Sequence, residues 1–219
     1  KNGGRYDGVQ HHAPQFDFLR LLHQTQLRKQ SQISLMISQP IVNWTFSQMQ
    51  EYLPADVGYE LINDELFKMP TPSAIHQEIS ANLDFLMQSF VRHNQLGKLF
   101  TAPLDVLLDS TTVVEPDLFF IENSKRSIIK QHVEGVPDLV VEIISPSSYI
   151  RDTITKKELY ERFGIKEYWL IDPANQVIEV FVLENGKFQL HNYAVETGIV
   201  RSVVLEGFEA EAHDILVHN

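Results

Sequence analysis

The periodicity of the sequence predicts an α/β (α+β) fold, in which helices flank a central mixed β-sheet. Two segments, 113–121 and 137–144, are dominated by β-branched and aromatic residues, the composition of buried strands. Residues 74–93 instead keep apolar side chains at helical spacing. Because strand-like and helical segments continue to alternate after these, we expect one domain built around a sheet.

The composition is that of a globular protein without disulfides. The chain has 219 residues, which is enough for one domain with a sizeable core, and its hydrophobic fraction of 43% is ordinary. It has no cysteine, no basic-then-apolar segment at its start, and no apolar run of the roughly 20 residues that a membrane span needs. We therefore expect a cytoplasmic protein that does not bind membranes and has no thiolate metal site.

The first part of the chain differs from the rest. Residues 1–40 are polar, weakly patterned and rich in His and Gln. We expect an N-terminal extension there that is flexible or not native, followed by the domain over 41–219. The pair His11-His12 in this extension is interpreted as incidental rather than as a metal site.

The domain is expected to begin with a helix and a hairpin. Thr45 is a suitable N-cap for a short helix that ends near Leu53. Residues 58–69 alternate around Asn63-Asp64, which are acceptable turn residues, and so predict a β-hairpin. The long helix 74–93 follows. Its expected core stripe consists of Ile75, Ile79, Leu83, Leu86 and Phe90.

The remaining elements are mainly strands. Residues 98–108 predict a strand that is interrupted at Pro103, before the strands 113–121 and 137–144. A helix over 152–163 is stopped by Gly164. The last expected strands cover 167–173, 176–183, 188–193 and 200–205, with a hairpin turn at Glu184-Asn185-Gly186.

The helix 152–163 distinguishes between two adjacent lysines. Positions i, i+3, i+4 and i+7 share a helix face, and from Lys156 these positions hold Leu159, Tyr160 and Phe163. Lys156 is therefore predicted to point toward the core, and Lys157 to point away from it. The alternative is that only the stem of Lys156 lies along the core while its ammonium reaches water.

Two predicted strands carry acidic residues in apolar surroundings. Asp117 follows a proline in the first strand and Glu142 lies in the second, and a buried carboxylate is costly unless it is paired or binds a metal. Asp138 shares a face with Glu142 but precedes it by four residues, about 13 Å along the strand. We therefore interpret Asp138 as a residue at the start of the strand, and Asp117 as the partner of Glu142.

These residues resemble the motifs of the PD-(D/E)XK (restriction-endonuclease-like) nuclease superfamily. The longer pattern is similar to that of its Uma-two type restriction endonuclease family and covers roughly residues 44 to 219. The matching pieces are Pro116-Asp117-Leu118, Pro137 to Glu142 with Ser145-Pro146-Ser147, the set Asp152, Lys156 and Tyr160, and Gly164 to Pro173. The resemblance implies a single restriction-endonuclease-like domain, with the Asp117 and Glu142 strands side by side.

The resemblance also implies an endonuclease that hydrolyses phosphodiester bonds, in DNA, with Mg²⁺ or Mn²⁺ as cofactor. Its catalytic residues would be Asp117, Glu142 and Lys156. One departure is that Ile144 occupies the usual position of the lysine, two residues after the acid, and the family resemblance implies that Lys156 on the helix takes its place. Oxygen-rich carboxylate sites are those that Mg²⁺ prefers.

Further residues are assigned from the resemblance and from local charge. Glu60 is expected to join Asp117 and Glu142 at the metal, the alternative being an ordinary solvent-facing strand acid. His76 is expected to contact substrate or to orient an acid, the alternative being a structural histidine at a helix start. Arg151 and Lys157 lie in the most basic segment, 151–168, and are expected to contact the substrate.

The overall charge opposes this interpretation. Lys+Arg 18 minus Asp+Glu 29 gives −11, whereas DNA-binding domains are usually basic. A local basic patch or the cleft of a homodimer would have to hold the nucleic acid. Two alternatives therefore remain open: a non-catalytic DNA-binding or protein-interaction module on the same fold, and a nuclease that acts on RNA.

Overall fold

The computed structural model describes residues 44–54 and 56–216. The expected extension 1–40 lies outside these residues. The described part begins with α2 (Phe46–Tyr52), for which Thr45 is the N-cap: its side chain accepts a hydrogen bond from the backbone N–H of Gln48, and the Gln48 side chain accepts one from the backbone N–H of Thr45. The predicted first helix is thus confirmed.

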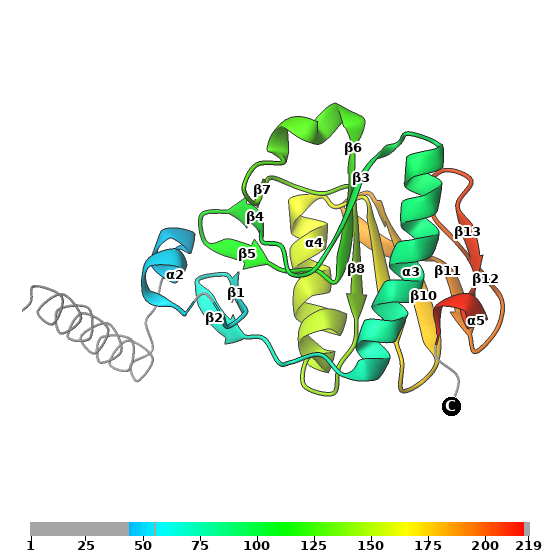
Figure 1. Ribbon diagram of the computed structural model, residues 1–219, viewed down its shortest axis with the longest axis horizontal. Coiled ribbons are helices and arrows are strands. Elements are labelled where there is room, and N and C mark those ends of the chain that lie inside the picture. The colour runs from blue at the N-terminus through cyan, green and yellow to red at the C-terminus, as the bar shows by residue number, and fades with distance from the viewer. Residues whose placement is uncertain (1–43, 55, 217–219) are drawn as a thin grey trace, which may run out of the picture.

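A six-stranded mixed sheet forms the centre of the molecule (Figure 1). Strands β8 and β9 are parallel, and every other neighbouring pair in this sheet is antiparallel. In spatial order the strands are β11 (Lys187–Val195), β10 (Val177–Glu184), β9 (Glu167–Asp172), β8 (Leu139–Ile143), β6 (Leu118–Glu122) and β3 (Gly97–Thr101). The predicted central mixed sheet is confirmed. Strand β6 begins directly after Asp117 and β8 contains Glu142, and these two strands are neighbours.

A second, five-stranded sheet lies beside the central one. In spatial order it contains β2 (Glu65–Lys68), β1 (Tyr59–Ile62), β5 (Thr112–Val114), β4 (Val106–Asp109) and β7 (Val133–Glu134). The predicted hairpin is present as β1 and β2, and its turn residues Asn63 and Asp64 both have positive φ, as a tight hairpin turn requires. A 3-10 helix, Asn123–Ile128, connects β6 toward β7.

Two expected strands are each divided between the sheets. The single strand predicted over 113–121 is wrong, because β5 ends at Val114 and β6 begins at Leu118 in the other sheet. The interruption predicted at Pro103 within 98–108 is confirmed, and the two sides of it, β3 and β4, lie in different sheets. Pro116 and Pro103 lie in the two connections, where a residue without a backbone N–H interrupts no ladder. Asp117 therefore lies in a link between sheets.

Helices pack on opposite faces of the central sheet (Figure 1). The 20-residue helix α3 (Ala74–His93) covers one face, where alternate strand residues such as Phe120 and Val141 contribute to its core. A π-helical segment, Arg151–Lys156, continues into α4 (Lys157–Phe163). Helix α4 covers the other face, where the strand residues Phe119 and Val140 contribute to the core. Gly164 ends α4 in the left-handed conformation, as predicted.

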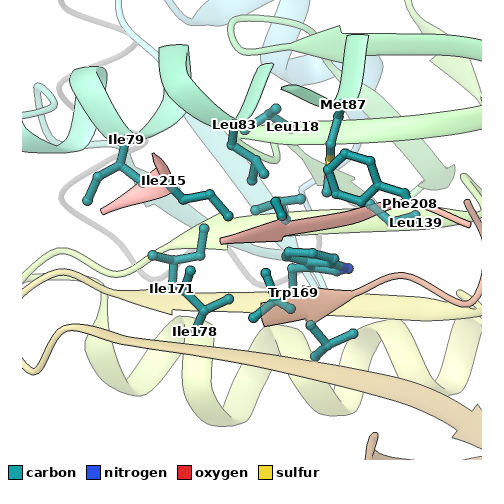
Figure 2. Close-up of a cluster of buried hydrophobic side chains, with 14 of the residues drawn as sticks. Ile79, Leu83, Met87, Leu118, Leu139, Trp169, Ile171, Ile178, Phe208 and Ile215 are labelled. Atoms are coloured by element: carbon teal, nitrogen blue, oxygen red, sulfur yellow. The ribbon is translucent and has the colours of Figure 1, made fainter. Parts of the chain in front are cut away.

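The core under α3 shows one correction. Ile75, expected in its core stripe, is 40% exposed because it lies in the first turn. The fully buried residues of this helix are Ile79, Leu83, Met87 and Val91, which repeat every fourth position. Figure 2 shows the first three on the same side as Leu118 and above Trp169, Ile171 and Ile178, in a cluster that also contains Leu139, Phe208 and Ile215.

The C-terminal part adds a small third sheet. Strand β12 (Ile199–Arg201) replaces the longer strand expected over 200–205 and pairs with β13 (Glu209–Glu211). The short helix α5 (Ala212–Ile215) follows and packs beside α3. Neither β13 nor α5 was predicted. In the described part of the chain, no helix is both long and apolar enough to cross a membrane.

Candidate active site

A cavity of about 1220 Å³ opens at the carboxyl end of β8. It is bounded by the β1–β2 hairpin, the start of α3, the link between β5 and β6, and the π-helical segment. The ionisable residues expected from the sequence that line it are Glu60, His76, Asp117, Glu142, Arg151 and Lys156. The fold thus brings together residues that are up to 96 positions apart (60 to 156) in the sequence.

Lys156 lies at the centre of the ionic contacts in this cavity. Its Nζ is 2.7 Å from Glu60 Oε1 and 2.9 Å from Glu142 Oε1, and it is 3.8 Å from Asp152 Oδ1. Burial lowers the pKa of Lys156, but the attraction of Glu142, Glu60 and Asp152 outweighs burial and raises this pKa above its usual value. The predicted inward orientation is confirmed. The alternative, an ammonium that reaches water, is wrong because the side chain is only 3% exposed.

Lys157 occupies a different environment. Its Nζ lies 3.4 Å from the centre of the Phe181 ring, which is a cation–π contact. Burial lowers the pKa of this lysine. Lys157 is not among the residues that line the cavity, so the structure does not bring it to the other expected substrate-binding residues.

Glu142 is held through one of its oxygens. Glu142 Oε1 accepts hydrogen bonds from Lys156 Nζ at 2.9 Å and from the Tyr160 hydroxyl at 2.6 Å. Burial raises the pKa of Glu142 well above its usual value; Lys156 opposes this shift, and the carboxylates of Asp152, Asp117 and Glu60 add to it. Glu142 is therefore a buried acid whose negative charge is incompletely compensated.

Asp117 is oriented by a backbone amide and a histidine. Its Oδ2 accepts a hydrogen bond from the Ile143 N–H at 2.7 Å, which ties the β5–β6 link to the end of β8. Its Oδ1 lies 3.2 Å from His76 Nε2. Burial lowers the pKa of His76, but its contact with Asp117 outweighs burial and raises it. The expectation that His76 orients an acid agrees with this geometry.

Glu60 and Arg151 form the wall of the cavity on the hairpin side. Glu60 is fully buried, so the alternative of a solvent-facing strand acid is wrong. Its Oε1 accepts a hydrogen bond from the Glu115 backbone N–H at 3.1 Å, and its Oε2 lies 3.5 Å from Arg151 Nη1. The Arg151 guanidinium also lies over the Phe67 ring, at 4.9 Å.

Sequence reasoning did not assign three further residues to the site. Tyr160 donates to Glu142, Asp152 is only 3% exposed beside Lys156, and Glu115 lines the same cavity. Burial, followed by the nearby Asp105 and Glu60, raises the pKa of Glu115 to about 7. Asp152 and Tyr160 could have been found, because they lie four residues before and after Lys156. Glu115 gives no comparable signal.

The donor chemistry fits a divalent cation only in part. Among the described residues, seven carboxylates line the cavity together with three cations, Lys68, Arg151 and Lys156, so negative charge is in excess. Asp117 and Glu142 supply the oxygen ligands that Mg²⁺ prefers. Within residues 44–54 and 56–216, however, no group of three or more His, Cys, Asp and Glu is arranged to hold a metal ion. Glu60 instead contacts Lys156 and Arg151.

Comparisons with known proteins establish the affiliation of the chain. Residues 45–213 match the Uma2 family, which is described as "Putative restriction endonuclease". The chain belongs to this family. The resemblance seen in the sequence motifs is therefore confirmed, and it places the chain in a family of nuclease type. A search of curated proteins finds no match.

A solved structure of another protein has the same fold as this Uma2 family member. It is described as a putative nuclease belonging to DUF820 from Anabaena variabilis ATCC 29413. The two structures superpose with a TM-score of 0.65 at 17% sequence identity, over 78% of this chain and 97% of the other. At this identity the similarity concerns the fold, and the roles of individual residues remain predictions.

Proposed function

We propose that this protein is a metal-dependent endonuclease that hydrolyses phosphodiester bonds in DNA. The observation that carries the proposal is the convergence of Asp117, Glu142 and Lys156 in one cavity, from three separate elements of the fold. Membership of the Uma2 family supports the reaction class. The choice of DNA and of Mg²⁺ or Mn²⁺ as the ion belongs to the proposal.

Asp117 and Glu142 would hold the metal ion. An ion of this kind lowers the pKa of a bound water and neutralises charge on the phosphodiester. The hydrogen bond from Ile143 N–H to Asp117 Oδ2 and the two hydrogen bonds to Glu142 Oε1 fix the positions of the two carboxylates before any ligand arrives. Positioning of this kind is what divalent ions with strict geometry require.

Lys156 would act as a fixed positive charge rather than as a base. Because Glu142, Glu60 and Asp152 raise its pKa, the ammonium stays protonated at neutral pH and cannot accept a proton from water. A protonated amine can instead stabilise the negative charge that develops on the phosphate. Glu60 and Arg151 set its position from the other side, and His76 positions Asp117.

The experiment that tests this function combines metal binding with cleavage. Calorimetry with Mg²⁺ and Mn²⁺ should show saturable binding that Glu142→Gln weakens strongly. Labelled DNA and RNA strands, alone and as duplexes, should then be incubated with the protein in each metal and in EDTA. We expect cleavage of DNA that requires metal and is lost in Glu142→Gln but kept in Lys157→Met.

The opposite result would favour the other class of function. An absence of metal-stimulated cleavage for every nucleic acid would indicate a non-catalytic module on the same fold. Cleavage confined to RNA would keep the site assignment and replace the substrate.

A further inference from the structure

The rim of the active-site cavity carries exposed apolar side chains. Ser148 and Arg151 both line the cavity, and the two residues between them, Tyr149 and Ile150, are 52% and 69% exposed. Ile154, one turn further along, is 54% exposed. Exposed apolar side chains that gather next to cavity-lining residues in the chain point to a contact surface.

The π-helical segment explains why this surface adjoins the ionic site. Within one segment, Asp152 and Lys156 are buried against Glu60 and Glu142, while Ile154 remains exposed. The Thr153 hydroxyl donates to the Tyr149 carbonyl at 2.6 Å, which fixes the start of the segment. Short π-helical stretches are rare and frequently occur at functional sites. One turn thus presents a charged face to the cavity and an apolar face to its rim.

A second element contributes an exposed apolar side chain to the cavity. Ile75, in the first turn of α3, lines the cavity and is 40% exposed. Exposed apolar side chains from two elements therefore accompany the ionic residues of the cavity. A ligand that matches this arrangement carries a phosphate flanked by flat apolar groups that are free to make contacts.

The charges around the cavity disfavour a duplex. In the part of the chain that the structure describes, three Lys and Arg residues line it, Lys68, Arg151 and Lys156, and the last two already contact carboxylates. Of the ten other Lys and Arg residues in the described part of the chain, five are in ion pairs: Lys125, Lys130, Lys166, Lys187 and Arg201. Duplex binding depends on neutralising many closely spaced phosphates, whereas stacking of unpaired bases on aromatic side chains needs no cation.

We propose that the site takes nucleic acid as an unpaired single strand, and that Tyr149 is a platform on which a base next to the scissile phosphate stacks. This proposal rests on the proposed nuclease function, because it names the form of substrate for the same cavity. Lys68 and Arg151 contact the flanking phosphates, and Ile75 and Ile150 contact the neighbouring sugars and bases.

The test measures binding without hydrolysis. Fluorescence anisotropy follows a labelled single strand of about twelve nucleotides and the duplex of the same sequence, in EDTA and again with Ca²⁺, while gels verify that the probe stays intact. We expect tighter binding of the single strand. Tyr149→Ala should raise its Kd about tenfold, and Tyr149→Phe should leave it nearly unchanged, because the ring provides the contact.

Two controls make this result specific. Tyr193 is 62% exposed on β11 and does not line the cavity, so Tyr193→Ala should leave Kd unchanged. Because Lys156 is held between Glu60 and Glu142, we count Lys68 and Arg151 as the cations that neutralise phosphates, and log Kd should rise with log salt concentration with a slope of about 1.4. Comparing the Kd of a DNA probe with that of an RNA probe of the same sequence shows which of the two nucleic acids the site prefers.

Equal or tighter binding of the duplex, no binding of either probe, or an unchanged Kd in Tyr149→Ala would overturn the proposal. These outcomes are separate from those that concern the nuclease reaction. Metal-dependent cleavage of single strands and duplexes at equal rates would overturn the single-strand proposal alone. Selective binding of single strands without cleavage in any metal would overturn the nuclease function alone.

Discussion

The two acids of β8 have similar surroundings in the sequence but opposite electrostatic environments. Asp138, just before the strand, and Glu142, near its end, are both almost fully buried. Asp138 lies 2.8 Å from Lys125 Nζ and 3.0 Å from Lys166 Nζ, and its Oδ2 accepts from the Glu122 N–H at 2.9 Å. Burial raises the pKa of Asp138, but these contacts outweigh burial and lower it.

Glu142 shows the reverse balance. Among residues 44–54 and 56–216, Lys156 is the one cation in contact with it, and that lysine is shared with Glu60, while Asp152 and Asp117 add negative charge nearby. The ionised form of Asp138 is therefore stabilised by folding, and the ionised form of Glu142 is destabilised. The comparison indicates that the first acid serves the stability of the fold and the second creates an excess of negative charge that a cation would relieve.

The largest expected effect separates the two acids by activity. Glu142→Gln should lower metal-dependent cleavage by about a thousandfold or more, because it removes a proposed ligand and the charge that positions Lys156. Its melting temperature should be unchanged or higher, since a neutral amide is less costly to bury than a carboxylate. Asp138→Asn is the matched control and should keep its activity per folded molecule. Equal losses of activity in both variants would remove the distinction.

Removing the shared lysine should have the next largest effect. Lys156→Met leaves Glu60 and Glu142 buried without their cation, and we expect a loss of about 3 kcal/mol in the free energy of unfolding at neutral pH. Lys157→Met removes only a cation–π contact with Phe181, so its loss should stay below about 1 kcal/mol. Urea denaturation measures both values. Similar losses would contradict the interpretation of the helix face.

Asp138→Asn should have a smaller effect on stability than Lys156→Met. We expect a loss of about 2 kcal/mol, because the variant loses charge-assisted contacts with two lysines that can return to water. The amide oxygen can still accept the hydrogen bond from the Glu122 N–H. Urea denaturation at neutral pH checks this value, and an unchanged or higher stability would mean that Asp138 does not stabilise the fold.

The smallest expected effects concern the pH dependence of stability, which should differ between Glu142 and Asp138. Glu142 has a folded-state pKa above its ordinary value of 4.5, so its ionisation costs stability as pH rises from about 4.5. The advantage of Glu142→Gln over the parent should therefore grow toward neutral pH. Asp138 has a folded-state pKa below its ordinary value of 3.8, so its contribution is present above about pH 3.8 and is lost in stronger acid.

Melting temperatures of the parent and both variants, measured in EDTA from about pH 3 to about pH 8, test this prediction. The deficit of Asp138→Asn should be full at neutral pH and should shrink below about pH 3.8. A deficit of Asp138→Asn that stays constant into strong acid, or an advantage of Glu142→Gln that falls with rising pH, would be inconsistent with the assigned shifts.

Local features of the chain could be predicted because they depend on short-range physics. Thr45 caps α2, Gly164 ends α4, and the helix 74–93 was predicted with its bounds. Helical spacing alone distinguished buried Lys156 from Lys157. Each of these depends on backbone geometry or side-chain periodicity within a few turns, so neighbouring residues suffice to determine it.

The assembly of the site depended on contacts between distant segments. The sequence left Glu60 undecided between a metal ligand and a solvent-facing acid, and only the packing of the β1–β2 hairpin against the π-helical segment brings it to Lys156. The division of 113–121 between two sheets, which leaves Asp117 in a link beside His76, was likewise invisible in the local pattern. A strand pattern shows which side chains share a face. The charges that surround them are set by the other segments that tertiary packing brings near.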